Sequence, residues 1–448
     1  MEEPVRLIET VTGLLEEERE ERLAFLLDES HPADVARVLR ELPPAEQARV
    51  FGLLGREQAG AVLHEIDDQT LLALVRGLDE TELSDILDRM PADNAAAVVD
   101  KLPAEQAEQI LDLMKEEQAE EVQELREYGE KTAGRIMSPR FVAVHEDATV
   151  AQAIDHVRKA VSADEVFYLY VVDDHGHLLG LVPFRRLITA DPECPVKLIR
   201  VEDVVSVTPD TDQEEVARLV AKYNVLALPV VSHDRRLLGT VTIDDVIDII
   251  QEEATEDIQR LAGVPGDETV FDPHRAVVTK RLIWRLINLA TAVLAAAVIG
   301  LFEKSIESLA ALAVFMPIVA SMGGIGTTQT STVVIRGLAL GDMIPAHLWR
   351  VLKKEVHLAL TTGLANGVVM MAIAYLWKGQ ILLSVIVGVA LLFNMLVAAV
   401  VGVLVPLALK TFRIDPAIAS SVIVTTFTDV FGFFSFLGLA TLLITFLL

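Results

Sequence analysis

The chain of 448 residues is 52% hydrophobic and carries a formal net charge of −28. Most of that charge lies in residues 1–130, where 34 acidic and 12 basic side chains make a surface that repels nucleic acid and favours cations. The single cysteine, Cys194, excludes an intrachain disulfide and a cysteine metal cluster, which is typical of a reducing compartment.

Residues 1–130 contain a repeated phrase in which a proline precedes an alanine and an acid. The phrase occurs at 31–34, 43–46, 90–93 and 102–105, and each copy is followed by apolar residues at helical spacing. Proline suits the first turn of a helix, where its missing N–H has no intrahelical partner, and the acid suits the positive end of the helix. We therefore predict an acidic all-α domain of short helices stacked as a superhelix.

Residues 131–250 read as two copies of an α/β unit. The first copy predicts strands at 141–144, 168–172 and 178–182 and a helix at 150–159. The second predicts strands at 204–207, 227–231 and 237–241 and helices at 212–223 and 243–250. The phrase at 170–180 is repeated at 229–239, and the whole unit resembles a tandem pair of cystathionine-β-synthase (CBS) modules.

Residues 251–280 are predicted to form an acidic connecting helix that ends near Gly263, followed by a linker. Residues 281–448 then hold five apolar segments, each long enough to cross about 30 Å of hydrocarbon. They lie near 283–302, 309–335, 356–377, 381–409 and 420–447. Lysines and arginines, including Arg285 and Arg413, concentrate on one side, which predicts a cytoplasmic N-terminal half and an external Leu448 in the cell membrane.

Asp429 is the one charged side chain between Ser420 and Leu448. An ionised carboxylate at membrane depth costs about 2.5–3.5 kcal/mol, so it is expected to face water or a cation. Hydroxyls surround it at Ser420, Ser421, Thr425, Thr426 and Thr428. Oxygen ligands with a single carboxylate suit a largely hydrated Mg²⁺. A structural hydrogen bond to a neighbouring helix and a proton relay stay open as alternatives.

The second apolar segment contains Pro317 and glycines at 323, 324 and 326. We expect these residues to break the helix at membrane depth, so that freed carbonyls and Gln329 line the same path as Asp429. The alternative is close helix packing through small residues. Asn366 and Asn394 are expected to be interhelical hydrogen-bonding residues rather than ligands.

Taken in order, the acidic repeats, the CBS pair, the acidic connecting helix and five spans with Thr428-Asp429-Val430 near the end resemble the MgtE family of magnesium channels and transporters. The resemblance implies a homodimer whose fifth spans line a pore with Asp429 as its acid. It also implies closure by cytosolic Mg²⁺ that bridges acidic residues. The chain departs from the family at Ile325 and Thr328, where asparagine is usual, and at Asn224, where an acid is frequent.

Candidate regulatory ligands follow from spacing and from this resemblance. Carboxylates at i, i+3 and i+4 share one helix face and repel one another unless a cation screens them. The candidates are Glu253, Glu256 and Asp257 on the connecting helix, Asp245 and Asp248 on the preceding helix, and, as weaker candidates, Glu57, Asp88, Asp93, Asp212, Glu214 and Asp415. Family members can bind ATP in the CBS pair, and Tyr168 and Arg185 match positions that take part.

The sequence thus predicts a multidomain protein: helical repeats at 1–130, a CBS pair at 131–250, a connecting helix and linker at 251–280, and a five-helix transmembrane domain at 281–448. The leading hypothesis is a channel that moves Mg²⁺ into the cytoplasm and is gated by Mg²⁺. A gradient-coupled carrier of Mg²⁺, Co²⁺ or Mn²⁺ is the alternative, and a nucleotide sensor that moves no ion is a third. Expected partners are a second copy, lipid and divalent cations, without nucleic acid. We expect no enzyme, because no nucleophile–base pair or phosphate-binding glycine loop is present.

Overall fold

The computed structural model describes residues 3–443 except 160–166, 267, 271, 273 and 413. Arg413 and Leu448, which entered the charge argument, lie outside the described residues, as do the side chains of Ser420 and Ser421. The chain divides into two compact units, Met1–Ile250 and Gln251–Leu448, each described by itself below.

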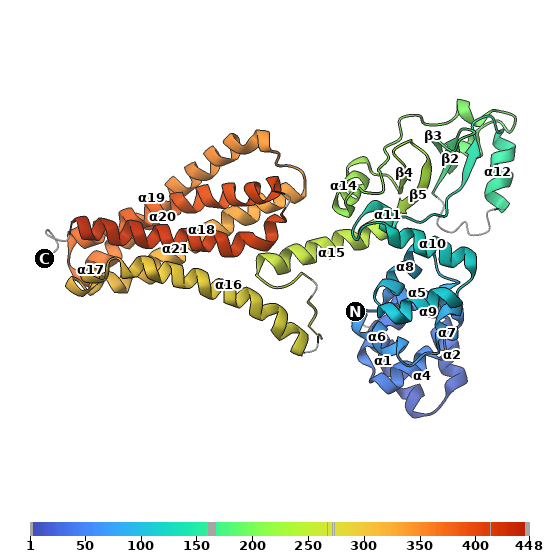
Figure 1. Ribbon diagram of the computed structural model, residues 1–448, viewed down its shortest axis with the longest axis horizontal. Helices are drawn as coiled ribbons and strands as arrows, with labels where there is room; N and C mark the ends of the chain where they lie inside the picture. Colours follow the sequence, from blue (N-terminus) through green and yellow to red (C-terminus); the bar gives the residue numbers. More distant parts are fainter. Residues whose placement is uncertain are drawn as a thin grey trace. The chain divides into compact units, whose positions relative to one another are not determined.

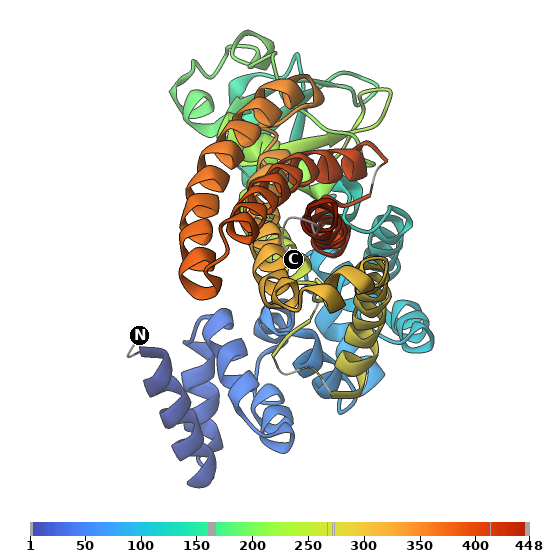
Figure 2. The ribbon, with the colours of Figure 1, turned by 90° about the vertical axis from the view of Figure 1, so that its left-hand side faces the viewer.

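Short helices fill the first part of unit 1 and stack side by side, as predicted (blue to cyan in Figure 2). His31 and Asp67 show how they begin: each side chain accepts a hydrogen bond from a backbone N–H of the first turn. The helices are α1 (Glu3–Glu16), α2 (Glu20–Asp28), α3 (Pro32–Glu41), α4 (Pro44–Phe51), α5 (Arg56–Glu65), α6 (Asp68–Val75), α7 (Glu80–Leu87), α8 (Ala92–Asp100), α9 (Ala104–Leu113), α10 (Glu116–Glu127) and α11 (Ala133–Ile136).

Two small sheets form the rest of unit 1, one for each predicted CBS module (Figure 1). In the first sheet, β2 (Tyr168–Val172) pairs in parallel with β1 (Ala143–His145) and antiparallel with β3 (Leu178–Pro183). In the second, β4 (Ala227–Val231) pairs antiparallel with β5 (Leu237–Thr242). The remaining elements are α12 (Val150–Lys159), α13 (Phe184–Thr189), the 3₁₀ turn η2 (Val196–Leu198), α14 (Gln213–Tyr223) and α15 (Ile243–Leu261).

The strand predicted at 204–207 is wrong, because only Val207 pairs with the sheet. Its N–H donates to Pro229 at 3.1 Å and its carbonyl accepts from Val231 at 2.8 Å. Two residues later, Pro209 has no N–H to donate at the next ladder position, so the pairing does not extend.

The predicted division between the helix at 243–250 and the acidic connecting helix is also wrong. Both belong to α15, since no proline or glycine interrupts Ile243–Leu261. The helix ends just before Gly263, whose φ of +72° reverses the chain. Val246 and Ile249 of α15 belong to the same buried cluster as residues of the helical repeats, so this part of α15 packs within unit 1.

Five helices of unit 2 are long and apolar enough to cross a membrane, which confirms the predicted number among the described residues. Within the unit, α20 packs against three other helices, α18, α19 and α21, while α16 packs against α21 (Figure 1). The elements are α16 (His274–Gly300), α17 (Glu303–Ser308), α18 (Ala311–Ala339), the 3₁₀ turn η3 (Pro345–His347), α19 (Leu348–Lys378), α20 (Ile381–Thr411) and α21 (Pro416–Leu442).

The predicted break in the second span is wrong, since α18 continues through Pro317 and the glycines. Gly323 instead permits close contact with α20: a Cβ there would lie 2.1 Å from Asn394 Nδ2. That nitrogen donates to the Val319 carbonyl at 2.8 Å, which confirms Asn394 as an interhelical hydrogen-bonding residue. The structure therefore supports the alternative of small-residue packing.

Candidate ion pathway and metal-binding acids

Asp429 lies in α21, and its carboxylate is half-buried. Among the residues that the structure describes, no hydrogen bond or ion pair to this carboxylate is found. The described residues therefore give no support to the alternative of a structural hydrogen bond. An acid in this setting needs water or a cation to offset the cost of its charge.

The threonines around Asp429 hydrogen bond to carbonyls of their own helix. Thr426 donates to Val422 at 2.6 Å, Thr425 donates to the same carbonyl at 3.1 Å, and the buried Thr428 donates to the Thr425 carbonyl at 3.0 Å. Because its bond uses the hydroxyl proton, the half-buried Thr426 oxygen can still accept a hydrogen bond or bind a cation.

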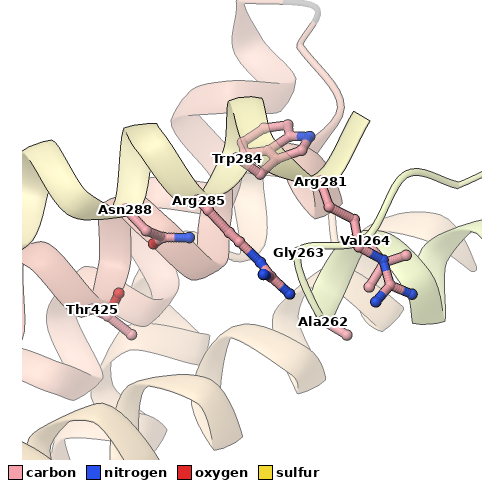
Figure 3. Close-up of a pocket in the computed structure, with 8 residues that line it drawn as sticks. All are labelled: Ala262, Gly263, Val264, Arg281, Trp284, Arg285, Asn288 and Thr425. Carbon is pink, nitrogen blue, oxygen red and sulfur yellow. The ribbon is translucent and has the colours of Figure 1, made fainter. Parts of the chain in front are cut away.

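A cavity of about 370 Å³ lies between the loop after α15, the beginning of α16 and α21 (Figure 3). Thr425 contributes the α21 wall, and Asp429 lies one turn away on the same helix face, at i+4. Six waters at about 30 Å³ each occupy about 180 Å³, so the cavity is wide enough for a hydrated Mg²⁺. Its lining residues are Ala262, Gly263, Val264, Arg281, Trp284, Arg285, Asn288 and Thr425.

Two arginines of α16 line this cavity, whereas the charge pattern had placed them at the membrane boundary. Arg281 is neutralised by the buried Glu268, to which Nε donates at 2.9 Å and Nη2 donates as well. Figure 3 shows the Arg285 side chain extending from α16 toward the loop at Ala262. Its positive charge opposes the entry of a cation, a feature that the sequence alone did not reveal.

The residues at which the chain departs from the MgtE pattern lie on an exposed face of α18. Ile325 is 51% exposed, and Thr328 and Gln329 are exposed three and four residues later. The Thr328 hydroxyl donates to the Gly324 carbonyl of its own helix at 3.0 Å. Within one chain, none of these side chains is covered by a neighbouring helix.

A further buried acid lies in the membrane spans at Glu355 of α19, and the sequence pattern did not single it out. It is only 5% exposed, accepts a hydrogen bond from Thr330 at 3.2 Å and lies 3.3 Å from the Lys354 ammonium. The only signal in the sequence was an acid directly after two lysines at the beginning of a span, a pattern that is usual for solvated residues.

Asp93 and Asp245, which are distant in sequence, lie near each other in unit 1. Asp93 is in the first turn of α8, and Asp245 accepts a hydrogen bond from Thr242 at 2.7 Å near the beginning of α15. Burial, followed by the negative charge of Asp93, raises the pKa of Asp245 from 3.8 to about 7. Two like charges at a packed boundary form a place where a divalent cation would relieve repulsion.

Glu256 and Asp415, two of the predicted ligands, meet at one arginine. Arg260 forms ion pairs with Glu256, one turn earlier in α15, and with Asp415. Asp415 also begins α21, since its Oδ1 accepts from the Ala417 N–H at 2.7 Å. The end of the connecting helix therefore contacts the beginning of the fifth span through a guanidinium.

Several other candidate acids have local structural roles. Asp212 caps α14 by accepting from the Glu214 N–H at 2.8 Å, and Asp88 accepts from the Lys115 N–H at 2.9 Å, joining α7 to α10. Glu57 lies in the first turn of α5. The remaining candidates, Asp248, Glu253 and Asp257, all lie on α15.

The predicted nucleotide residues lie in the first CBS module. Tyr168 is the first residue of β2, and its hydroxyl accepts from the Leu226 N–H at 3.1 Å; Arg185 is exposed on α13. The cavity beside Tyr168 holds only about 10 Å³. A nucleotide therefore needs side chains to move before it can enter there.

Comparison with known proteins matches each part of the chain to a family model. The models are a divalent cation transporter domain at 316–439, the MgtE intracellular N domain at 30–131 and CBS domains at 133–193 and 197–252. The magnesium transporter MgtE of Thermus thermophilus is 38% identical over 323 residues, which are 71% of this chain and 72% of that protein. The chain belongs to the MgtE family of magnesium transporters. The MgtE of Bacillus subtilis is 34% identical over 319 residues, covering 71% and 70% of the two chains.

Solved structures agree with the MgtE assignment for the part before the spans. The cytosolic domain of the Mg²⁺ channel MgtE in complex with ATP is 36% identical and covers 54% of this chain and 99% of its own, with a TM-score of 0.52. The soluble part of a magnesium transporter is 29% identical and covers 56% and 99%, also with a TM-score of 0.52. The resemblance to MgtE and the predicted fold class are confirmed, and the protein is a multi-pass membrane protein.

Proposed function

We propose that this protein moves Mg²⁺ into the cytoplasm along a path that passes Asp429. The observation that carries the proposal is a half-buried carboxylate in α21 for which the described residues supply no partner. The half-buried Thr426 oxygen near it and the cavity one turn away offer the oxygen ligand and the room that a hydrated cation needs. Its relatives carry the name magnesium transporter, and no catalytic chemistry is needed for this role.

The path is completed by a second copy of the chain. Beside the exposed Ile325, Thr328 and Gln329 leave polar groups exposed on a membrane helix, and polar groups at that depth need protein or water around them. A homodimer whose fifth spans face each other covers such a surface and brings two Asp429 carboxylates to one path. The protein lies in the cell membrane among lipids, with its N-terminus in the cytoplasm and its C-terminus outside, as the distribution of lysine and arginine favours.

Cytosolic Mg²⁺ closes the path by compacting the part before the spans. The like-charged Asp93 and Asp245 support this mechanism, because a bridging cation favours the packed form of α8 and α15. The other candidate acids bind further Mg²⁺ ions on the helical repeats at 1–130, the CBS pair at 131–250 and the connecting segment at 251–280. Nucleic acid has no role, since the surface is strongly acidic.

ATP binds in the CBS pair at Tyr168 and Arg185 and tunes this response. The ATP complex of the related cytosolic domain supports the proposal. The cavity of about 10 Å³ beside Tyr168 implies that binding opens the site.

Mg²⁺ uptake by the full-length protein in liposomes tests the central role of Asp429. We expect Asp429→Asn to reduce uptake about 100-fold, since the 2.5–3.5 kcal/mol cost of a buried charge corresponds to roughly two orders of magnitude in cation binding. Glu307→Gln is the matched control, because it removes an exposed acid from α17. Wild-type uptake by the Asp429 variant would refute the proposal.

A carrier coupled to a proton or sodium gradient is the competing function. Single-channel recordings in a planar bilayer separate the two. Discrete Mg²⁺ current steps that disappear in Asp429→Asn support a channel. Uptake that requires an imposed gradient and never produces such steps supports the carrier.

A further inference from the structure

The turn between β2 and β3 carries three side chains that have no part in the proposed Mg²⁺ function. One donor atom from each of Asp173, His175 and His177 lies within 4.8 Å of the other two. His177 Nδ1 is 2.8 Å from Asp173 Oδ2, and the two imidazole rings stack with centroids 5.7 Å apart. Donors about 2.1 Å from a shared ion stand at most about 4.2 Å from each other, so small side-chain rotations allow all three to bind one ion.

The backbone of this turn holds the three side chains in place. Asp173 Oδ1 accepts from the N–H groups of both His175 and His177 at 2.9 Å, and Gly176 takes a φ of +79°. The turn is also tied to the second CBS module, because its Gly176 carbonyl accepts from the Leu237 N–H at 3.0 Å. A rigid turn of this kind orders the ligands before an ion arrives.

The second module contains the same turn without imidazoles at the positions of His175 and His177. Ser232, Asp234 and Arg236 stand where the first module has Asp173, His175 and His177. The turn still forms there, since Ser232 Oγ accepts from the Arg236 N–H at 3.1 Å and Arg235 takes a φ of +64°. The fold therefore requires the turn but not the histidines.

We propose that Asp173, His175 and His177 bind a borderline divalent transition cation of the Zn²⁺ or Co²⁺ class, with water completing the shell. Two imidazoles and one carboxylate suit such ions, whereas Mg²⁺ prefers an all-oxygen shell. Two ligands are partly shielded, with side-chain exposures of 28% for Asp173 and 35% for His177, while exposed His175 leaves a way in. An ion bound here stiffens the contact between the two modules and is independent of the acids proposed for Mg²⁺.

The test is a Co²⁺ titration of the full-length protein in detergent, purified without a histidine tag and kept in millimolar Mg²⁺. We expect one Co²⁺ per chain, seen by its visible absorption, to be displaced by Zn²⁺ but not by Mg²⁺. His175→Gln combined with His177→Gln should weaken Co²⁺ binding at least about 10-fold. His233→Gln, which removes an exposed imidazole from the equivalent turn, should leave it unchanged.

A second measurement separates loss of binding from loss of fold. Zn²⁺ should raise the unfolding temperature of the wild type and of His233→Gln, but not that of the double variant, whose Mg²⁺ uptake should stay normal. The proposal is overturned if the wild type binds no Co²⁺ beside Mg²⁺, or if the double variant binds it equally well. Because transport is measured on the same preparations after reconstitution into liposomes, failure of this site is distinguishable from failure of the proposed function.

Discussion

Replacing Asp245 by asparagine should tighten the packing of α15 on the helical repeats in Mg²⁺-free solution. In the folded protein, burial and the charge of Asp93 raise the pKa of Asp245 from 3.8 to about 7. Between pH 3.8 and about pH 7, the Asp245 carboxyl therefore keeps its proton in the folded protein and loses it in the unfolded chain. Stability is fully present below pH 3.8 and falls as the pH rises toward 7, where the carboxylate ionises beside its neighbour.

The magnitude follows from the size of that rise. At about 1.36 kcal/mol per pH unit, the ionised carboxylate of Asp245 costs at most about 4 kcal/mol. Asp245 is partly exposed and accepts a hydrogen bond from Thr242, so screening reduces the expected gain on neutralisation to about 1–2 kcal/mol. A gain of that size corresponds to roughly a 5- to 30-fold change in a local opening equilibrium.

Hydrogen–deuterium exchange of the full-length protein at pH 8 measures this opening in α8 and α15. Without Mg²⁺, Asp245→Asn should exchange more slowly than wild type by the factor above, and millimolar Mg²⁺ should slow the wild type more than the variant. Glu252→Gln is the control, because Glu252 is exposed on the same helix and its charge is not among those that raise the pKa of Asp245. If Asp245→Asn exchanges like wild type without Mg²⁺, or if Mg²⁺ protects both equally, the like-charge argument is wrong.

Three further changes test other parts of the structure. Arg285→Gln should raise Mg²⁺ flux most at low ionic strength, since it removes a positive charge from the cavity. If the variant and the wild type give equal flux at every salt concentration, Arg285 does not act on the ion path. Gly323→Ala should destabilise the spans by about 1–3 kcal/mol in thermal unfolding, because its Cβ would lie 2.1 Å from Asn394, whereas Gly324→Ala has open space and should be tolerated. Arg260→Gln removes the guanidinium that Glu256 and Asp415 share, so Mg²⁺ should bind these carboxylates more readily. Hydrogen exchange near Gly263 should then slow at lower Mg²⁺ concentrations than in wild type. If the Mg²⁺ concentration that gives half of the protection is unchanged, these residues do not form a Mg²⁺ site.

Most predictions based on local pattern agreed with the structure, and the strand at 204–207 and the division of α15 are the exceptions. The strand at 168–172 and the helix at 150–159 have the predicted bounds, because alternation and helical spacing are properties of the segment itself. The expected break in α18 failed for a tertiary reason. Glycine in a helix signals either a bend or a close neighbour, and only the position of Asn394 on α20 shows that it is the neighbour.

By itself, the sequence determined the order of the parts and the five spans, and it singled out Asp429 as a candidate, since a charge in an apolar run is costly wherever the run folds. Only the tertiary structure placed Asp93 beside Asp245, joined Arg260 to Asp415 across 155 residues and brought Arg285 to the cavity near Thr425. Electrostatic interactions act over a few ångströms of space, and no spacing along the chain specifies which distant residues come that close.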